Sequence, residues 1–172
     1  MFMNRLLIRN IVMLLLWVPA ALAGGVRIGQ LAPKLVFGRM IQGQFDSVSS
    51  GKPLLLEFWA TWCSPCQKSM ADLQLDFTHY PNWKGKVVLI AASMDDTADI
   101  ADKRIQSKGW NQTHNVWLQD KALQSYHVGG IPFAYVIDAE GNIVVSGSEE
   151  SLNLADIVSQ QLEAGFKSLK SE

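Results

Sequence analysis

The chain has 172 residues, of which 48% are hydrophobic and 18% charged, and its formal net charge at pH 7 is −1. It contains no long basic run, so we expect no nucleic-acid partner. The length suits one domain with a core of its own. The chain has only two cysteines, and these say most about its chemistry.

The first 23 residues have the pattern of a secretory signal peptide. Arg5 and Arg9 precede a short apolar stretch, and Ala21-Leu22-Ala23 is a small-residue cleavage site. We expect residues 1–23 to be removed and residues 24–172 to form one domain. A retained membrane anchor is the alternative, although the uncharged stretch is shorter than the ~20 residues that span a bilayer comfortably. Both interpretations place the protein in the periplasm or cell envelope.

The first predicted elements lead to the cysteines. Apolar pieces broken by glycines predict a small hairpin or edge strands between Leu31 and Gly51. Residues 54–59 are apolar on both faces apart from Glu57, which is typical of a central parallel strand. An apolar stripe at helical spacing then predicts an amphipathic helix, and it consists of Cys66, Met70, Leu73, Phe77 and Tyr80.

The second half alternates strands and helices. Asp95, Asp96 and Asp99 gather at the start of one expected helix, where acids complement the helix dipole. The expected elements are strands at 87–92, 115–118, 133–137 and 142–145, and helices at 95–107, 121–126 and about 152–169, the last capped by Asn153. This order predicts a layered α/β fold, with a mixed central sheet and helices on both faces.

Cys63 and Cys66 stand two residues apart, so both sulfurs can meet at the first turn of a helix and form a reversible disulfide. A structural disulfide normally closes a longer loop, because the stabilisation grows with loop length. A redox pair is therefore the better interpretation. The pair could also supply two zinc ligands, but zinc sites usually need four. We expect neither a metal nor a cofactor.

Two motifs resemble one family. The segment FWATWCSPC, which ends at Cys66, resembles the active-site segment of thioredoxins, and Gly130-Ile131-Pro132 resembles their cis-proline loop. The chain between these motifs is longer than in a minimal thioredoxin by about one helix–strand unit. This insertion, together with an exported N-terminus, resembles the TlpA/ResA-like thioredoxins of bacterial envelopes. The resemblance covers roughly residues 31–169 and implies a thioredoxin-like three-layer fold with thiol-disulfide oxidoreductase activity.

The motifs assign roles to individual residues. Cys63, at the exposed N-terminal end of a helix that stabilises its thiolate, is expected to be the nucleophile, and Cys66 the resolving cysteine. Trp62 flanks the reactive sulfur and offers apolar surface to a partner. In this family Pro132 is cis, which leaves the backbone of Ile131 free to pair with an extended substrate. A trans loop proline is the alternative.

Glu57 takes the position of the buried aspartate of thioredoxins. Burial of a carboxylate is unfavourable unless it is paired or protonated, so its pKa should be raised, and it could exchange a proton with Cys66. The alternative is a strand-end glutamate that reaches solvent. Ser69 stands where some cytochrome-maturation relatives carry a glutamate, which weakens a cytochrome c assignment.

The residues between the cysteines favour a direction of electron flow. Ser64-Pro65 resembles the Gly-Pro of reducing thioredoxins, so we expect a reductant of protein disulfides that a membrane-bound electron donor keeps reduced. An oxidase or isomerase is the alternative. A copper-handling thioredoxin-like protein is the alternative from another class, with His127 as the nearest candidate ligand, but the cysteines of such proteins are typically three residues apart.

Overall fold

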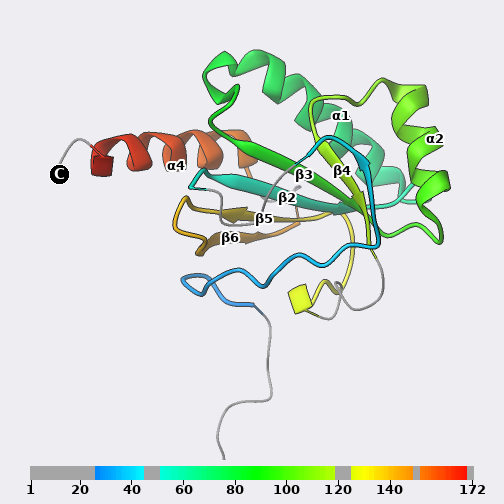
Figure 1. The fold of residues 1–172 in the computed structure, drawn as a ribbon, viewed down its shortest axis with the longest axis horizontal. Coiled ribbons are helices and arrows are strands. Elements are labelled where there is room, and N and C mark those ends of the chain that lie inside the picture. The colour runs from blue at the N-terminus through cyan, green and yellow to red at the C-terminus, as the bar shows by residue number, and fades with distance from the viewer. Residues whose placement is uncertain (1–25, 45–50, 119–124, 149–151, 170–172) are drawn as a thin grey trace, which may run out of the picture.

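The computed structural model describes residues 26–44, 51–118, 125–148 and 152–169. Six strands form one mixed sheet in the order β1-β4-β3-β2-β5-β6 (Figure 1). β2, β3 and β4 are parallel, whereas β1 and β5 run antiparallel to their neighbours. The strands are β1 (Arg39–Gln42), β2 (Leu54–Trp59), β3 (Val88–Ser93), β4 (His114–Trp117), β5 (Phe133–Ile137) and β6 (Ile143–Gly147).

Three helices pack on one face of the sheet. They are α1 (Ser64–His79), α2 (Ala98–Lys108) and α4 (Leu154–Leu169), and a short 3-10 helix, η1 (Pro81–Trp83), follows α1. Leu55 of β2 packs with α1 and α4, and Trp59 packs with α1 and α2. The side chains alternate along β2, so these two residues point to the same face.

The opposite face is covered by chain segments from outside the sheet. Leu54, Leu56 and Phe58 of β2 pack there with Leu35 and Tyr126. The Tyr126 hydroxyl donates to the Pro33 carbonyl at 2.6 Å, which ties the helical residue Tyr126 to the N-terminal segment. The helix expected at 121–126 lies outside the described residues except for its last two positions.

β2 lies at the centre of the molecule. All six of its residues are buried, and it pairs with β3 on one side and β5 on the other. Full burial of each of its leucines contributes roughly 1.5–3 kcal/mol. The segment after β2 holds the cysteines, and it is therefore anchored to the rigid centre of the sheet.

One expected element differs from that found, and another takes one of its two expected forms. The region before β2 holds one described strand, β1, which pairs with β4 as an edge strand, as one of the two alternatives predicted. α2 begins at Ala98 and not at Asp95, because the Asp95 side chain accepts a hydrogen bond from the Thr61 backbone N–H. The expected signal peptide lies outside the described residues. Within the described part of the chain, no helix is both long and apolar enough to cross a membrane.

Candidate active site

The two cysteines form a disulfide at the start of α1. Their Cα atoms are 5.3 Å apart. Cys63 is the N-cap of the helix, and its sulfur accepts a hydrogen bond from the Cys66 backbone N–H at 3.2 Å. Pro65 occupies the first turn, where its missing N–H removes no helical bond. The free N–H groups and the dipole of α1 thus point at the Cys63 sulfur.

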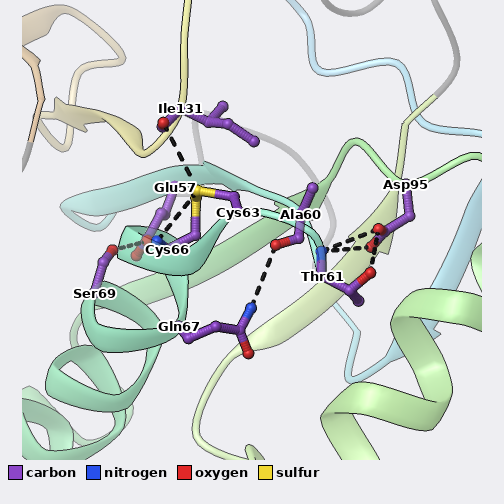
Figure 2. The surroundings of a disulfide bond; sticks show 9 residues. All are labelled: Glu57, Ala60, Thr61, Cys63, Cys66, Gln67, Ser69, Asp95 and Ile131. Atoms are coloured by element: carbon purple, nitrogen blue, oxygen red, sulfur yellow. Dashed lines mark hydrogen bonds between the residues drawn. A yellow bond between two sulfur atoms is a disulfide. The ribbon is translucent and has the colours of Figure 1, made fainter.

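The cis-proline loop meets the cysteines because of the sheet register. Phe58 near the end of β2 pairs with Phe133 at the start of β5, so the segment after β2 lies beside the segment before β5. The Ile131–Pro132 peptide bond is cis. The Ile131 carbonyl oxygen lies 3.7 Å from the Cys63 sulfur, and Figure 2 shows this carbonyl pointing at the disulfide.

The two sulfurs differ little in exposure, whereas the neighbouring tryptophan is open to solvent. Cys66 is fully buried and Cys63 is only 5% exposed in the oxidised protein, although Ser64 and Pro65 at the start of α1 are exposed. The approach of the Ile131 carbonyl accounts for part of this cover. Trp62 is 68% exposed and forms apolar surface directly beside Cys63 in the chain.

Glu57 lies within β2, on the face of the sheet that α1 covers. It is fully buried, and its neighbours in register are Ala91 of β3 and Ala134 of β5. Its carboxylate accepts a hydrogen bond from the Ser69 hydroxyl of α1 (Figure 2). The alternative of a strand-end glutamate that reaches solvent is therefore wrong.

Side chains that the sequence did not point to hold the loop before Cys63. The buried Asp95 carboxylate accepts from the Thr61 N–H at 3.0 Å and from the Thr61 hydroxyl at 2.7 Å (Figure 2). Ser93 adds a third bond to this carboxylate at 2.8 Å. On the other side, the Gln67 side chain donates to the Ala60 carbonyl at 3.3 Å. The Ser-x-Asp pattern at the end of a buried strand was the available signal for this network.

The metal alternative receives no geometric support in the described part of the chain. No group of three or more His, Cys, Asp or Glu side chains there is placed to hold a metal ion. His127 is exposed and has a positive φ of 50°.

Comparison with known proteins places this site in a family. A family model described as thioredoxin-like matches residues 51–143. The chain belongs to the thioredoxin-like family. It is 33% identical over 152 residues to thiol-disulfide oxidoreductase ResA of Bacillus thuringiensis (strain Al Hakam), with 82% of this chain and 86% of the relative covered. It is 27% identical over 124 residues to the thioredoxin-like protein YneN of Bacillus subtilis (strain 168), with 69% and 70% covered.

Solved structures agree with the fold of this thioredoxin-like protein. A putative protein disulfide isomerase from Bacteroides thetaiotaomicron superposes with a TM-score of 0.68 at 25% identity, over 83% of this chain and 94% of that one. The thioredoxin domain of a Bacteroides vulgatus thiol-disulfide oxidoreductase gives 0.66 at 24% identity, over 80% and 99%. The thioredoxin-like fold and the thiol-disulfide oxidoreductase activity expected from the sequence are confirmed.

Proposed function

We propose that this oxidoreductase is a dithiol reductant of the bacterial cell envelope, with Cys63 as its nucleophile and Cys66 as its resolving cysteine. The observation that carries the assignment is the placement of the Cys63 sulfur as the N-cap of α1, where the Cys66 N–H donates to it. A backbone donor and the helix dipole both favour a thiolate at this atom.

The reaction proceeds in two balanced steps. The Cys63 thiolate attacks one sulfur of a substrate disulfide, a mixed disulfide forms, and the other substrate sulfur leaves as a thiolate. Cys66 then loses its proton and attacks Cys63, which releases the second substrate thiolate. The protein is oxidised to the Cys63–Cys66 disulfide by two electrons, and the substrate disulfide is reduced to two thiols.

Glu57 takes the proton from Cys66 in the second step. Cys66 is fully buried, so water has little access to its thiol. Glu57 contacts Ser69, about one helical turn beyond Cys66, which brings the carboxylate to the face of α1 that carries Cys66. A buried carboxylate is a better base than an exposed one, because burial disfavours its charged form.

Trp62, Ile131 and Pro132 hold the substrate beside Cys63. The exposed Trp62 offers apolar area to a protein surface. Ile131 lies on a loop that has left the sheet ladder, so its backbone can pair with an extended substrate segment. Because the Ile131 carbonyl lies against the Cys63 sulfur, such a segment would cross the attacking atom.

Export and electron supply complete the proposal. Residues 1–23 act as a signal peptide, and a membrane-bound donor returns electrons to the disulfide after each turnover. The mass of the protein purified from a cell-envelope fraction tests the first point, because cleavage after Ala23 leaves Gly24 as the N-terminal residue. A mass that includes residues 1–23 would contradict cleavage and favour the retained anchor.

The direction of electron flow is tested by the reduction potential at equilibrium with glutathione. We expect a value close to the roughly −270 mV of thioredoxin. A value close to the roughly −120 mV of DsbA would contradict the reductant and favour an oxidase.

Substrates are identified by trapping. In Cys66→Ala the second step cannot occur, so the mixed disulfide on Cys63 should accumulate and can be isolated with its partner. Cys63→Ala is the matched control, and we expect it to trap far less. Equal trapping by both variants would contradict the assignment of Cys63 as the attacking residue.

A further inference from the structure

A groove lies beside the loop that leads to Cys63. Its volume is about 310 Å³, and it is lined by Thr61 of this loop and by four residues of α2: Ile100, Lys103, Arg104 and Ser107. The four α2 positions lie on one face of the helix. Lys103 and Arg104 follow Ile100 by three and four residues, and Ser107 follows them by four and three. Ile100 is 42% exposed, and Trp62 next to Thr61 is 68% exposed. The groove thus combines two cations with apolar surface next to the redox site.

The acids of α2 share one basic partner on the neighbouring strand. Arg39 of β1 contacts Asp99 at 2.7 Å and Asp102 at 3.6 Å, which compensates one of their two negative charges. Lys103 and Arg104 line the groove, and neither forms an ion pair with a carboxylate of the described residues. The groove therefore carries positive charge that suits an anionic group.

Arg104 is also fixed in relation to the redox helix. Its guanidinium donates to the Gln67 side chain at 2.9 Å, and Gln67 in turn donates to the Ala60 carbonyl. The Cys63 backbone N–H donates to that same carbonyl at 3.2 Å. The bond to Gln67 uses one of five guanidinium N–H donors. A ligand on Arg104 would thus lie at a defined place beside the active-site loop.

The carboxylate of Asp95, which bonds to Thr61 of the groove lining, forms no ion pair with Lys103 or Arg104. It is buried, and its oxygens accept bonds from Thr61 and Ser93. Asp95 therefore supports the loop from inside, while the cations face a cavity that is open to a partner.

We infer that the groove binds an acidic side chain of the polypeptide substrate, close to the disulfide that Cys63 attacks. The inference rests on the proposed reductant function and names its substrate class: protein disulfides with a nearby Asp or Glu. Arg104 offers the planar fork that matches a carboxylate, and Lys103 adds a second positive charge. Ile100 provides apolar surface for the methylene groups of the acidic residue.

The test uses pre-reduced protein in single-turnover reactions with three disulfide peptides. The peptides differ only at one position, two residues from the cysteine, which is Glu, Gln or Lys. We expect the wild type to reduce the Glu peptide about fivefold faster than the Gln peptide, as one partly exposed ion pair allows. The Lys peptide should be the slowest, and the differences should shrink as salt screens the charges. Bis(2-hydroxyethyl) disulfide, which is neutral, reports on dithiol exchange alone.

Two charge reversals on α2 locate the effect. Lys103→Glu should abolish the preference for the Glu peptide, whereas Lys108→Glu, the same change outside the groove lining, should retain most of it. If the wild-type protein reduces the three peptides at equal rates, or if the two reversals have equal effects, the groove does not bind the acidic side chain. Exchange with the neutral disulfide would then still support the proposed reductant. Failure to reduce any of these disulfides would overturn both.

Discussion

Glu57 is a carboxylate in the centre of a sheet, where ionisation is unfavourable unless hydrogen bonds compensate for lost water. Ser69 supplies one such bond from α1. Because Ser69 and Cys66 are three residues apart on this helix, they lie on neighbouring turns of one face. The acid is thereby joined to the part of α1 that carries the buried Cys66, whose proton it accepts in the reaction proposed above.

Glu57→Gln should slow the second chemical step without preventing the first. The amide keeps the volume and a hydrogen-bond acceptor for Ser69 but cannot take a proton, so we expect resolution of the mixed disulfide to slow by roughly 10- to 100-fold, within the usual range for loss of a general base. Rapid-mixing measurement of both steps separates the effects. Unchanged turnover from pH 6 to 9 would refute the proton relay.

Asp95 should contribute to stability through the loop before Cys63. Asp95→Ala leaves the Thr61 N–H and two hydroxyl groups without their acceptor, and unsatisfied buried groups cost about 1–3 kcal/mol each. We expect the free energy of unfolding to fall by at least 2 kcal/mol, an estimate from the same range. Urea denaturation measures it. Asp96→Ala is the control at the exposed neighbouring position, and an equal loss there would refute the specific role of Asp95.

At the scale of elements, the sequence predicted best where local pattern decides the structure. The strands at 54–59 and 133–137 were predicted with their observed bounds, because their apolar runs are buried on both faces. The start of α2 was missed because Asp95 bonds to Thr61, 34 positions away in the chain. The pairing of β1 with β4 is likewise long-range. Cys63, Cys66 and Pro132 came from motifs, whereas the Ser69–Glu57 contact needed the three-dimensional packing.

The pairing of the edge strand should depend on pH through His114 of β4. Burial lowers the pKa of this histidine, and its Nδ1 accepts the Gln44 backbone N–H at 3.1 Å, a bond that only an unprotonated nitrogen can accept. As pH falls below about 6.5, the unfolded chain binds a proton at this site before the native state does. The stabilisation is therefore complete above that pH and is lost as the pH falls through the native-state pKa.

Urea unfolding at pH 5 and pH 7.5 measures this dependence. We expect the wild type to be less stable at pH 5, and His114→Gln to show a smaller difference between the two pH values. His127→Asn, a change at an exposed histidine, should retain the wild-type difference. If His114→Gln keeps the whole difference, the acid sensitivity has another origin.

At the scale of the whole molecule, the sheet brings together two segments that are far apart in the chain. β2 ends beside the start of β5, so the cysteines and the cis-proline loop meet at one end of two antiparallel neighbours. The helices α1, α2 and α4 pack on one face, which leaves the N-terminal end of α1 at the same end of the sheet (Figure 1). The redox pair is therefore supported by the main core, and its oxidation state should affect the stability of the entire fold.

Unfolding and oxidation form a thermodynamic cycle. The difference in unfolding free energy between the oxidised and reduced proteins is therefore proportional to the difference in reduction potential between the unfolded and folded chains, through the charge of the two electrons transferred. A reductant has a folded potential below that of its unfolded dithiol, which requires the oxidised protein to be the more stable form. Each 30 mV of that difference corresponds to about 1.4 kcal/mol.

Urea unfolding with and without reductant measures the difference in unfolding free energy, and glutathione equilibration of the native protein measures the folded potential. The double variant Cys63→Ala, Cys66→Ala should show no effect of reductant. If the reduced wild type proves the more stable form, the protein belongs with oxidants such as DsbA, whose reduced form is stabilised, and the proposed direction of electron flow is wrong.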